Sequence, residues 1–286
     1  MEVVQTINAM QAYARALQQR GTQVAFVPTM GGLHEGHCSL IHLAKENADH
    51  VIASVFVNPT QFGPGEDLER YPRNLERDCE LCGEAGADAV FAPSVADMYA
   101  DGHTVYVVEE TVGNILEGAF RPGHFRGVLT VVAKLFLAVQ PQVAVFGRKD
   151  AQQLWLIQKM VRDLNFPIQI VAGPTVREAD GLALSSRNAY LSSEHRRQAT
   201  CLYRALQRAE DLFVAGERTA AILRTAMQEL VSEEPDADMD YIEIVDMDRF
   251  SPIATIKDAA LAVMAVRVGD TRLIDNWELS TGANKT

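Results

Sequence analysis

The sequence predicts an α/β fold, in which a parallel sheet with helices on both faces precedes a smaller α+β C-terminal domain. Two observations predict it. Up to about Thr175, short apolar runs alternate with helical patterns of about a dozen residues, which is typical of βαβ units. Beyond that point, two amphipathic helices are followed by short strands. We therefore expect two domains, residues 1–175 and residues 176–286.

The expected elements of the first domain follow from the period of the apolar residues. The runs 22–28 and 50–57 are apolar without alternation, as in strands that are buried on both faces. The same criterion predicts further strands at 88–93, 104–109, 142–147 and 167–173. Helical periodicity predicts helices at 36–48, 74–85, 127–139 and 150–165.

The second domain has a different order of elements. Its amphipathic stretches 193–215 and 218–232 predict two helices, and the acidic segment 232–240 is expected to be a loop. Strands are expected at 241–246, 259–268 and 271–276, with a turn at Gly269-Asp270. An arrangement of this kind favours a small antiparallel sheet packed with helices.

Composition and charge exclude several classes of protein. The chain has 286 residues, 48% of them apolar, with a formal net charge of −12. An acidic chain lacks the basic footprint of a nucleic-acid-binding protein, although a small anion needs only a local positive site. Residues 1–20 lack the features of a signal peptide, and the apolar stretch 128–146 is too interrupted to span a bilayer. We expect a cytoplasmic protein with no membrane or nucleic-acid partner.

The four cysteines do not form a disulfide scaffold in a chain of this length. Cys79 and Cys82 form a C-x-x-C pair within a helical pattern, but a zinc site needs a second pair, and acidic neighbours disfavour a thiolate. We expect two ordinary helix cysteines, although a redox pair stays open.

Ligands of open parallel sheets bind beyond the carboxyl ends of the strands, where helix N-termini also lie. The segments that follow four of the expected strands are rich in polar, glycine and basic residues, although the strands themselves are not. They read PTMGGLHEGHCSL, NPTQFGPGEDLERYP, GRKDAQQL and PTVREADGLALSSRN. One combined site would produce this clustering.

His34 and His37 form the sharpest local pattern. Their spacing of three, with Gly36 between them, differs from the H-E-x-x-H zinc motif, and no third ligand is evident. A helix cap with two surface histidines is the structural alternative. The glycines allow close backbone approach and a helix N-terminus favours an anion, so we favour a nucleotide-phosphate site. Two imidazoles beside it can donate hydrogen bonds to a phosphate.

Two further residue groups bear on the chemistry. Lys149 opens a helix after a strand, as a point charge suited to phosphate. The Ser185-Ser186-Arg187 segment offers two hydroxyls and a guanidinium to a phosphoryl group, or else simply caps a helix. The Walker phosphate loop and the G-x-S-x-G elbow are both absent.

Together these segments resemble the pantothenate synthetase (pantoate–β-alanine ligase) family, within the HxGH nucleotidyltransferase superfamily. The resemblance rests on PTMGGLHEGH (28–37), FVNPTQF (56–62), EGAFRPGHFRGV (117–128), FGRKDAQQ (146–153), DGLALSSRN (180–188) and RLIDN (272–276). It implies a Rossmann-like first domain that binds ATP and pantoate, a C-terminal domain that covers the active site, and a homodimer.

The resemblance also implies a reaction and its residues. The pantoate carboxylate would attack the α-phosphate of Mg²⁺-ATP to give pantoyl adenylate and pyrophosphate, and the amine of β-alanine would then displace AMP. The implied catalytic residues are His34, His37, Lys149, Ser185, Ser186 and Arg187. The implied ATP-binding set is Met30, Gly31, Gly32, Leu33, His34, Glu35, Gly36, His37, Gly147, Arg148, Lys149, Asp150, Val176, Leu184, Ser185, Ser186 and Arg187.

Pantoate would be held by Gln61 and Gln153, with Asn58 and Tyr71 as further candidates, and no protein metal ligand is expected. Neutral amides suit this task because each presents both a donor and an acceptor. Two other functions stay open: a nucleotidyltransferase that keeps the nucleotide in its product, and a nucleotide-binding module without turnover. The chain departs from the family at Arg148, where the usual residue is Glu, and we expect this arginine at the rim of the site.

Overall fold

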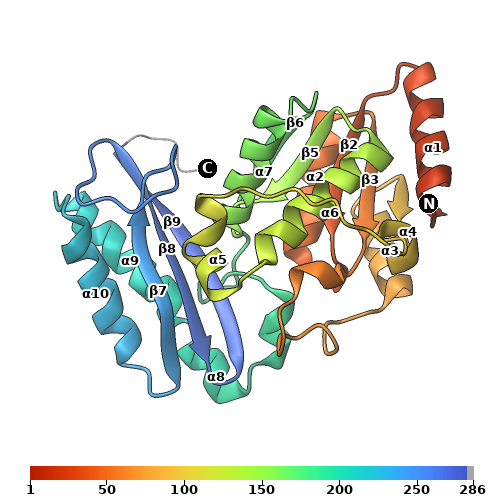
Figure 1. The fold of residues 1–286 in the computed structure, drawn as a ribbon. Helices are drawn as coiled ribbons and strands as arrows, with labels where there is room; N and C mark the ends of the chain where they lie inside the picture. Colours follow the sequence, from red (N-terminus) through yellow and green to blue (C-terminus); the bar gives the residue numbers. More distant parts are fainter. Residues whose placement is uncertain (282–286) are drawn as a thin grey trace. The chain divides into compact units, whose positions relative to one another are not determined.

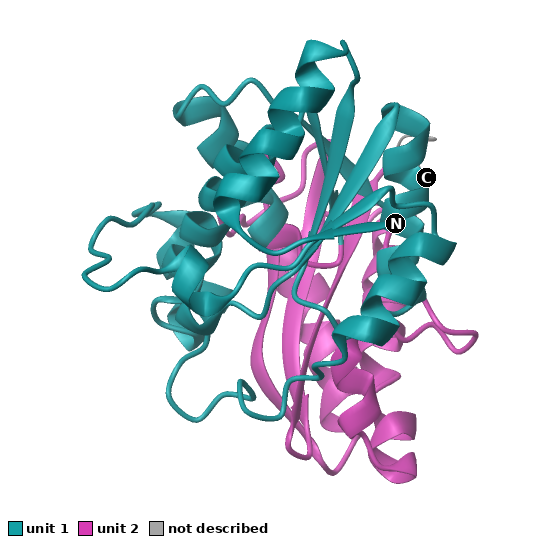
Figure 2. Ribbon diagram, turned by 90° about the vertical axis from the view of Figure 1, so that its right-hand side faces the viewer, with its two compact units in different colours: residues 1–148, 153–173 teal, residues 149–152, 174–286 magenta. Residues whose placement is uncertain are grey.

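The computed structural model describes residues 1–281 and divides the chain into two compact units (Figures 1 and 2). The first unit comprises residues 1–148 and 153–173, and the second comprises residues 149–152 and 174–286. The sequence analysis predicted one domain boundary, after residue 175. The two compact units meet at residues 173/174, and the short segment 149–152 also belongs to the second unit.

The first unit is built on a six-stranded parallel sheet with the order β1-β4-β3-β2-β5-β6. Its strands, in chain order, are β1 (Glu2–Val4), β2 (Val24–Thr29), β3 (His50–Val55), β4 (Ala89–Phe91), β5 (Val143–Gly147) and β6 (Gln169–Gly173). The predicted parallel sheet is thus confirmed, and β1 is an edge strand that the sequence analysis did not predict.

The helices of the first unit connect these strands. They are α1 (Ile7–Gln19), α2 (Glu35–Asn47), α3 (Leu75–Glu84), α4 (Val95–Met98), α5 (Glu117–Phe120), α6 (His124–Val139) and α7 (Ala151–Asp163), with 3-10 turns η1 (Pro59–Gln61) and η2 (Val112–Asn114). The first two residues of α7 belong to the second unit. The four predicted helices of this part are present, and α6 begins three residues earlier than expected.

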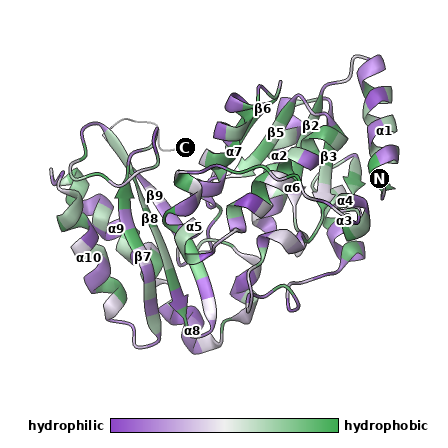
Figure 3. Ribbon diagram, viewed as in Figure 1, coloured by the Kyte–Doolittle hydropathy of each residue, from purple (hydrophilic) through white to green (hydrophobic). Residues whose placement is uncertain are grey.

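Both faces of the parallel sheet are covered, which explains the unbroken apolar runs of its strands. On one face, side chains of β2, β3 and β5 form a buried cluster with Ile41 of α2 and Cys82 of α3. On the other face, Phe136 of α6 meets Phe26 of β2 edge-on, with ring centroids 6.4 Å apart. Figure 3 shows the hydrophobic residues concentrated on these central strands.

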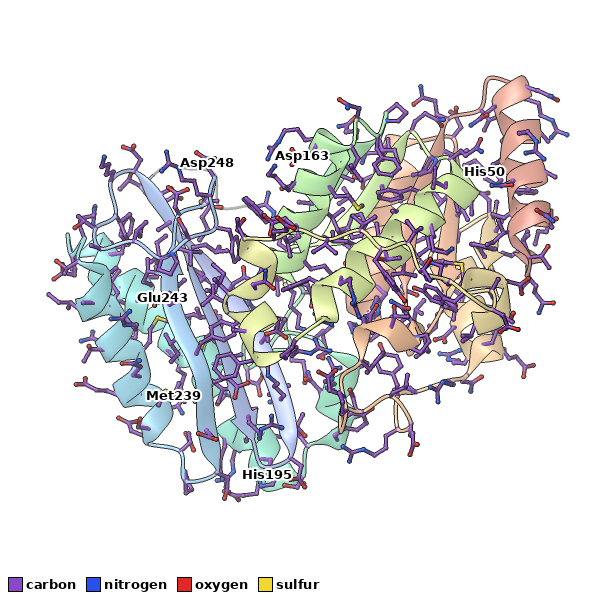
Figure 4. All side chains as sticks on the ribbon, in the orientation of Figure 1. His50, Asp163, His195, Met239, Glu243 and Asp248 are labelled. Atoms are coloured by element: carbon purple, nitrogen blue, oxygen red, sulfur yellow. The ribbon has the colours of Figure 1, made fainter. Side chains whose placement is uncertain are left out.

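Helix α1 is tied to the sheet through a polar contact as well as through packing. The hydroxyl of Tyr13 lies 2.9 Å from Nε2 of His50, which opens β3 and is labelled in Figure 4. Burial is the main factor that raises the pKa of the Tyr13 hydroxyl. Among residues 1–281, no helix has both the length and the apolar character needed to cross a bilayer.

The second unit contains a three-stranded antiparallel sheet of β7 (Ala237–Val245), β8 (Ala259–Val268) and β9 (Thr271–Ser280). Its helices are α8 (Ser193–Gln198), α9 (Cys201–Val214) and α10 (Ala220–Ser232), and η3 (Ser186–Tyr190) precedes them. A buried core joins α9 and α10 to the sheet, with Leu206, Leu223, Ile244 and Met264 fully enclosed. The small antiparallel domain predicted from the sequence is confirmed.

Three expectations about individual elements were wrong. Residues 104–109 are extended but form no strand, because the Val107 amide bonds to the Thr130 hydroxyl (3.0 Å) of α6. The predicted helix 193–215 breaks at Ala199-Thr200, where the Thr200 hydroxyl bonds to the Arg197 carbonyl at 2.8 Å. The acidic loop 232–240 ends early, since β7 begins at Ala237 and pairs with Val268.

Gly127 in α6 provides a test of how closely the helix packs against η1. A Cβ built on Gly127 would lie 2.4 Å from the carbonyl oxygen of Thr60 and 2.7 Å from Cα of Gln61. The clash is with backbone, so Gly127→Ala should destabilise the protein by about 1–3 kcal/mol, as overpacking does. Urea unfolding of the purified variant measures this change.

Gly83 of α3 is the matched control, because it is also a helical glycine. The nearest atoms to its Cβ position belong to the flexible side chain of Met1, at 3.8 Å and beyond. Gly83→Ala should therefore be neutral or stabilise by up to about 1 kcal/mol through its helix propensity. Equal unfolding midpoints for the two variants would contradict the close packing of α6 on η1.

Candidate active site

The candidate site lies where the winding of the parallel sheet reverses. Strand β2 pairs with β3 on one side and with β5 on the other, and the chain winds outward from it in both directions. Ligands of open α/β sheets bind beyond the carboxyl ends of the strands at such a point. The segments that follow β2, β3 and β5 begin at Met30, Phe56 and Arg148, and carry most of the residues that the sequence singled out.

A buried carboxylate organises the turn after β2. Asp78 of α3 is 3% exposed and accepts hydrogen bonds from the backbone N–H groups of Gly32 (3.1 Å) and Leu33 (2.9 Å). Gly31 has a φ of +87°, and a Cβ there would lie 2.8 Å from the Asp78 carboxylate. The glycines therefore serve the approach to Asp78, and the N–H groups of Gly32 and Leu33 are already engaged within the protein.

The two histidines of the HEGH motif cap α2 reciprocally. His34 is the N-cap, and its Nδ1 accepts from the Gly36 N–H at 3.1 Å. In turn, Nδ1 of His37 accepts from the His34 N–H at 3.3 Å, and the ring centroids are 4.1 Å apart. A neutral ring whose Nδ1 accepts carries its proton on Nε2. The helix-cap alternative and the donor role are thus compatible, because capping fixes both rings as Nε2–H donors.

Gln61 and Asn58 form a hydrogen-bonded pair beyond β3. They are 7% and 1% exposed, and Nδ2 of Asn58 donates to Oε1 of Gln61 at 2.9 Å. The Gln61 Nε2 lies 3.0 Å from the sulfur of Met30. The hydroxyl of Tyr99 donates to Oδ1 of Asn58 at 2.8 Å, which orients the Asn58 amide. The two amides are therefore fixed in the orientation that a polar ligand would meet.

The backbone of Gln61 is held from α6. Nδ1 of His124 lies 2.8 Å from the Gln61 carbonyl, and Nε2 lies 3.1 Å from Nη1 of Arg121. A guanidinium can only donate, so Nε2 accepts and the His124 proton lies on Nδ1, directed at Gln61. Burial lowers the pKa of His124 to about 4, with a further contribution from Arg121, so the ring is neutral at physiological pH.

Arg121 connects this histidine to the same loop a second time. Its guanidinium makes two hydrogen bonds to the Glu66 carboxylate, at 2.7 and 2.9 Å. These bonds to Arg121 hold the pKa of Glu66 below its usual value, although burial opposes the shift. The segment 58–66 is thereby fixed at two points by α5–α6, which gives a structural reason for the EGAFRPGHFRGV motif.

The structure also places the remaining candidates of the first unit. Tyr71 is buried, and its hydroxyl lies 3.4 Å from the Gly31 carbonyl. Gln153 is half-buried in the first turn of α7. Arg148 is exposed, and its backbone N–H bonds to the Gly173 carbonyl at 2.9 Å. Within the described part of the chain, no group of three or more His, Cys, Asp or Glu side chains could hold a metal ion.

Five candidates of the second unit lie in or directly after a hairpin. The Leu184 N–H donates to the Val176 carbonyl at 2.9 Å, and Arg177 pairs with Ala183 in an antiparallel bridge. The hairpin leads into the Ser-Ser-Arg segment, where the Ser185 hydroxyl caps η3 by accepting from the Arg187 N–H at 3.3 Å. Ser185 therefore has the capping role that the sequence left open.

The cysteines show no sign of a reactive thiol. All four are free, and burial raises the pKa of Cys82 to about 12. Burial also raises the pKa of Cys79, with a contribution from Asp78. A raised pKa disfavours the thiolate, so the pair has the character of ordinary helix cysteines.

The predicted residues therefore divide between the two compact units. The first unit holds the group around the HEGH turn and Gln61, and the second holds Lys149, Asp150 and the hairpin with its Ser-Ser-Arg segment. Sequence reasoning missed Asp78, Tyr99, Arg121 and His124. The last two stand in the quoted EGAFRPGHFRGV motif, which was the available signal, whereas Asp78 and Tyr99 stand in unremarkable helical and loop sequence.

Known proteins resemble the chain over nearly its whole length. The family model of pantoate–β-alanine ligase matches residues 2–278. The pantothenate synthetase of Moorella thermoacetica is 57% identical over 276 residues, which cover 96% of this chain and 98% of that protein. The enzyme of the same name from Pelotomaculum thermopropionicum is 51% identical, with the same coverage.

Solved structures agree in fold. The crystal structure of pantothenate synthetase from Thermus thermophilus has a TM-score of 0.93 at 49% identity, covering 98% of this chain and 100% of that one. The pantoate–β-alanine ligase of Francisella tularensis, solved in complex with β-γ ATP and β-alanine, has a TM-score of 0.81 at 35% identity, covering 99% of both chains. This chain belongs to the pantoate–β-alanine ligase family.

Proposed function

We propose that this protein condenses pantoate with β-alanine in an ATP-dependent reaction that passes through pantoyl adenylate and releases AMP and pyrophosphate. The observation that carries the proposal is the reciprocal capping of His34 and His37, which fixes two Nε2–H donors at the N-terminus of α2. A helix N-terminus with oriented donors suits a phosphate that gains charge in the transition state. Membership of the ligase family supplies the substrates.

The reaction needs no enzyme nucleophile. The pantoate carboxylate attacks the α-phosphate, the bond to pyrophosphate breaks, and the resulting mixed anhydride reacts with the amine of β-alanine to release AMP. Catalysis then consists of positioning and of charge stabilisation. Lys149 would neutralise phosphate charge, Asp150 would bind the ribose, Val176 would contact the adenine through its backbone, and the Ser-Ser-Arg segment would close over the triphosphate.

Pantoate suits the amide pair beyond β3. Oε1 of Gln61 accepts one hydrogen bond from Asn58, and Nε2 points at the sulfur of Met30. The Gln61 amide therefore retains hydrogen-bonding capacity for a hydroxyl or carboxylate. Gln153 would supply a second amide, with Tyr71 at the edge of the site. Mg²⁺ would enter with ATP and be held mainly by the phosphate oxygens, since Mg²⁺ sites commonly combine substrate phosphates with few protein ligands.

The family resemblance also supports a homodimer that works in the cytoplasm. Of the two other functions, a nucleotidyltransferase would keep the nucleotide in its product and would need cationic side chains for a phosphorylated acceptor. The amides around Gln61 are neutral, and the nearby Arg121 is paired with Glu66. Neither this function nor a binding module without turnover has an observation in its favour.

Product analysis tests the reaction directly. With ATP, pantoate and β-alanine, the purified protein should form AMP and pantothenate in equal amounts, because each adenylate formed is consumed by one amine. Quantitative chromatography of the nucleotides and of pantothenate measures both. The appearance of ADP and inorganic phosphate would show that the carboxylate is phosphorylated, and the adenylate route would be wrong.

Substitution of His37 tests the phosphate role of the HEGH pair. His37→Ala should slow adenylate formation by about a hundredfold or more, the size expected for one preorganised donor, in single-turnover measurements of pyrophosphate release. His37→Glu is the matched variant, because a glutamate at this helix position also accepts the N-cap N–H and so preserves the cap. If His37→Glu retained normal activity, the histidine would serve only as a helix cap.

The KM for pantoate and the affinity for ATP test whether the amides of Gln61 and Gln153 contact pantoate. Gln61→Ala should raise the KM for pantoate by about tenfold, the cost of about one hydrogen bond, and leave ATP affinity almost unchanged. Gln153→Ala should act in the same direction. Steady-state kinetics gives the first quantity and calorimetry with ATP gives the second. A parallel loss of ATP affinity would mean that these amides maintain the fold of the site rather than contact pantoate.

A further inference from the structure

Two adjacent buried polar residues of β9 have no role in the proposed reaction. Asp275 and Asn276 belong to the RLIDN motif and are 3% and 9% exposed. Buried polar side chains are costly unless they are hydrogen-bonded, so the groups they bind indicate their purpose. Each of them binds one of the two segments of the second unit that contain the candidate phosphate-binding residues.

Asn276 binds the segment that carries Lys149. Its Nδ2 donates to the backbone carbonyl of Lys149 at 2.8 Å. The residues are 127 positions apart in the sequence, and the segment 149–152 belongs to the second unit although the residues on both sides of it belong to the first. The Asn276 amide is thus a specific link between this short segment and the sheet of the second unit.

Asp275 binds the hairpin that leads to the Ser-Ser-Arg segment. Its carboxylate accepts two hydrogen bonds from Arg177, at 2.6 and 3.0 Å, and its side chain is only 1% exposed. The Arg177 guanidinium also lies over the rings of Tyr203 and Trp277, with 5.0 and 5.2 Å to their centroids. A planar guanidinium that is both bidentate and stacked has little freedom to move.

Arg177 also holds the hairpin at two further points, Gly181 and Ala183. Nη1 of Arg177 also donates to the Gly181 carbonyl at 3.0 Å, across the turn. Gly181 has a φ of +91°, and a Cβ there would overlap the ring of Tyr203. Arg177 bridges to Ala183, two residues before Ser185. The position of the Ser-Ser-Arg segment therefore depends on the Asp275–Arg177 pair.

We propose that Asp275 and Asn276 are positioning residues, which hold Lys149 and the Ser185–Arg187 segment in place to receive the triphosphate of ATP. This inference rests on the proposed function for the identity of the ligand. The two residues act through main chain and through Arg177, and neither is assigned a contact with substrate. Displacement of a positioned group by about 1 Å can lower the rate about a hundredfold, so removal of such an anchor is expected to lower the reaction rate.

A double-mutant cycle separates positioning from general stability. The Asn276 amide bonds to the backbone carbonyl of Lys149, and that carbonyl is still present in Lys149→Ala. A purely structural effect of Asn276→Ala would therefore be equal in both backgrounds. If Asn276 acts by placing the Lys149 side chain, Asn276→Ala should lower kcat/KM for ATP by about tenfold in the wild-type background and by less than about twofold in Lys149→Ala.

Gln198 of α8 provides the matched control. It is also a buried amide of the second unit, and its Nε2 and Oε1 bond to Asp236, at 2.8 and 3.1 Å. It lies one turn beyond His195, which Figure 4 labels, and it holds a segment with no proposed contact to ATP. Gln198→Ala should lower the melting temperature as Asn276→Ala does, but leave kcat/KM for ATP within about twofold.

The outcomes distinguish this inference from the proposed function. If the wild-type protein forms no AMP from pantoate, the proposed function fails. The double-mutant cycle of Asn276→Ala and Lys149→Ala is then measured on the Kd of α,β-methylene-ATP, and its result tests the inference. Equal effects of Asn276→Ala in both backgrounds, or no effect of Lys149→Ala on rate and Kd, overturn it. Should Asn276→Ala not fold, Asn276→Asp removes the same donor with the same side-chain shape and is analysed in the same way.

Discussion

The hydrogen bonds from Gly32 and Leu33 to the buried carboxylate of Asp78 are the interaction on which the carboxyl end of the parallel sheet depends. A carboxylate that is 3% exposed needs strong donors, and here backbone N–H groups supply them. Asp78 thereby fixes the chain immediately before His34, which must take the extended N-cap conformation for α2 to begin. The glycines, the carboxylate and the histidine cap form one continuous constraint.

The same physical device recurs beyond the other strands. Asn58 and His124 hold the side chain and the backbone of Gln61, and Asn276 holds the backbone of Lys149. Each anchor is a buried polar side chain; Asn58 is the N-cap of the same η1 turn that contains Gln61, whereas His124 and Asn276 come from other elements than the segments they hold. Irregular backbone at a sheet edge has no ladder of its own, so side chains must satisfy its polar groups. The fold positions the strands, and these anchors position the candidate site residues.

The sequence could predict the strands and helices whose apolar period is set by burial on the sheet, such as 22–28 and 36–48. It failed where a local polar contact decided the outcome. Residues 104–109 have the β-branched composition of a strand, yet Val107 donates to Thr130 instead of to a neighbouring strand. HEGH is a local motif and could be found, but Asp78 lies 46 residues from the amide it binds at Gly32, and no periodicity connects the two.

The division of the chain into two units gives a structural reason for the RLIDN motif (272–276). Gly147 pairs with Gly173 in the β5–β6 ladder of the first unit, whereas Lys149, two residues later, is bound by Asn276 of the second. Lys149 and the strand that precedes it are thus held by different units. A lysine side chain is long and flexible, so its charge is useful at a phosphate only if its backbone is fixed. Under the proposed positioning role, a motif near the end of the sequence, far from the HEGH turn, contributes to the same proposed reaction.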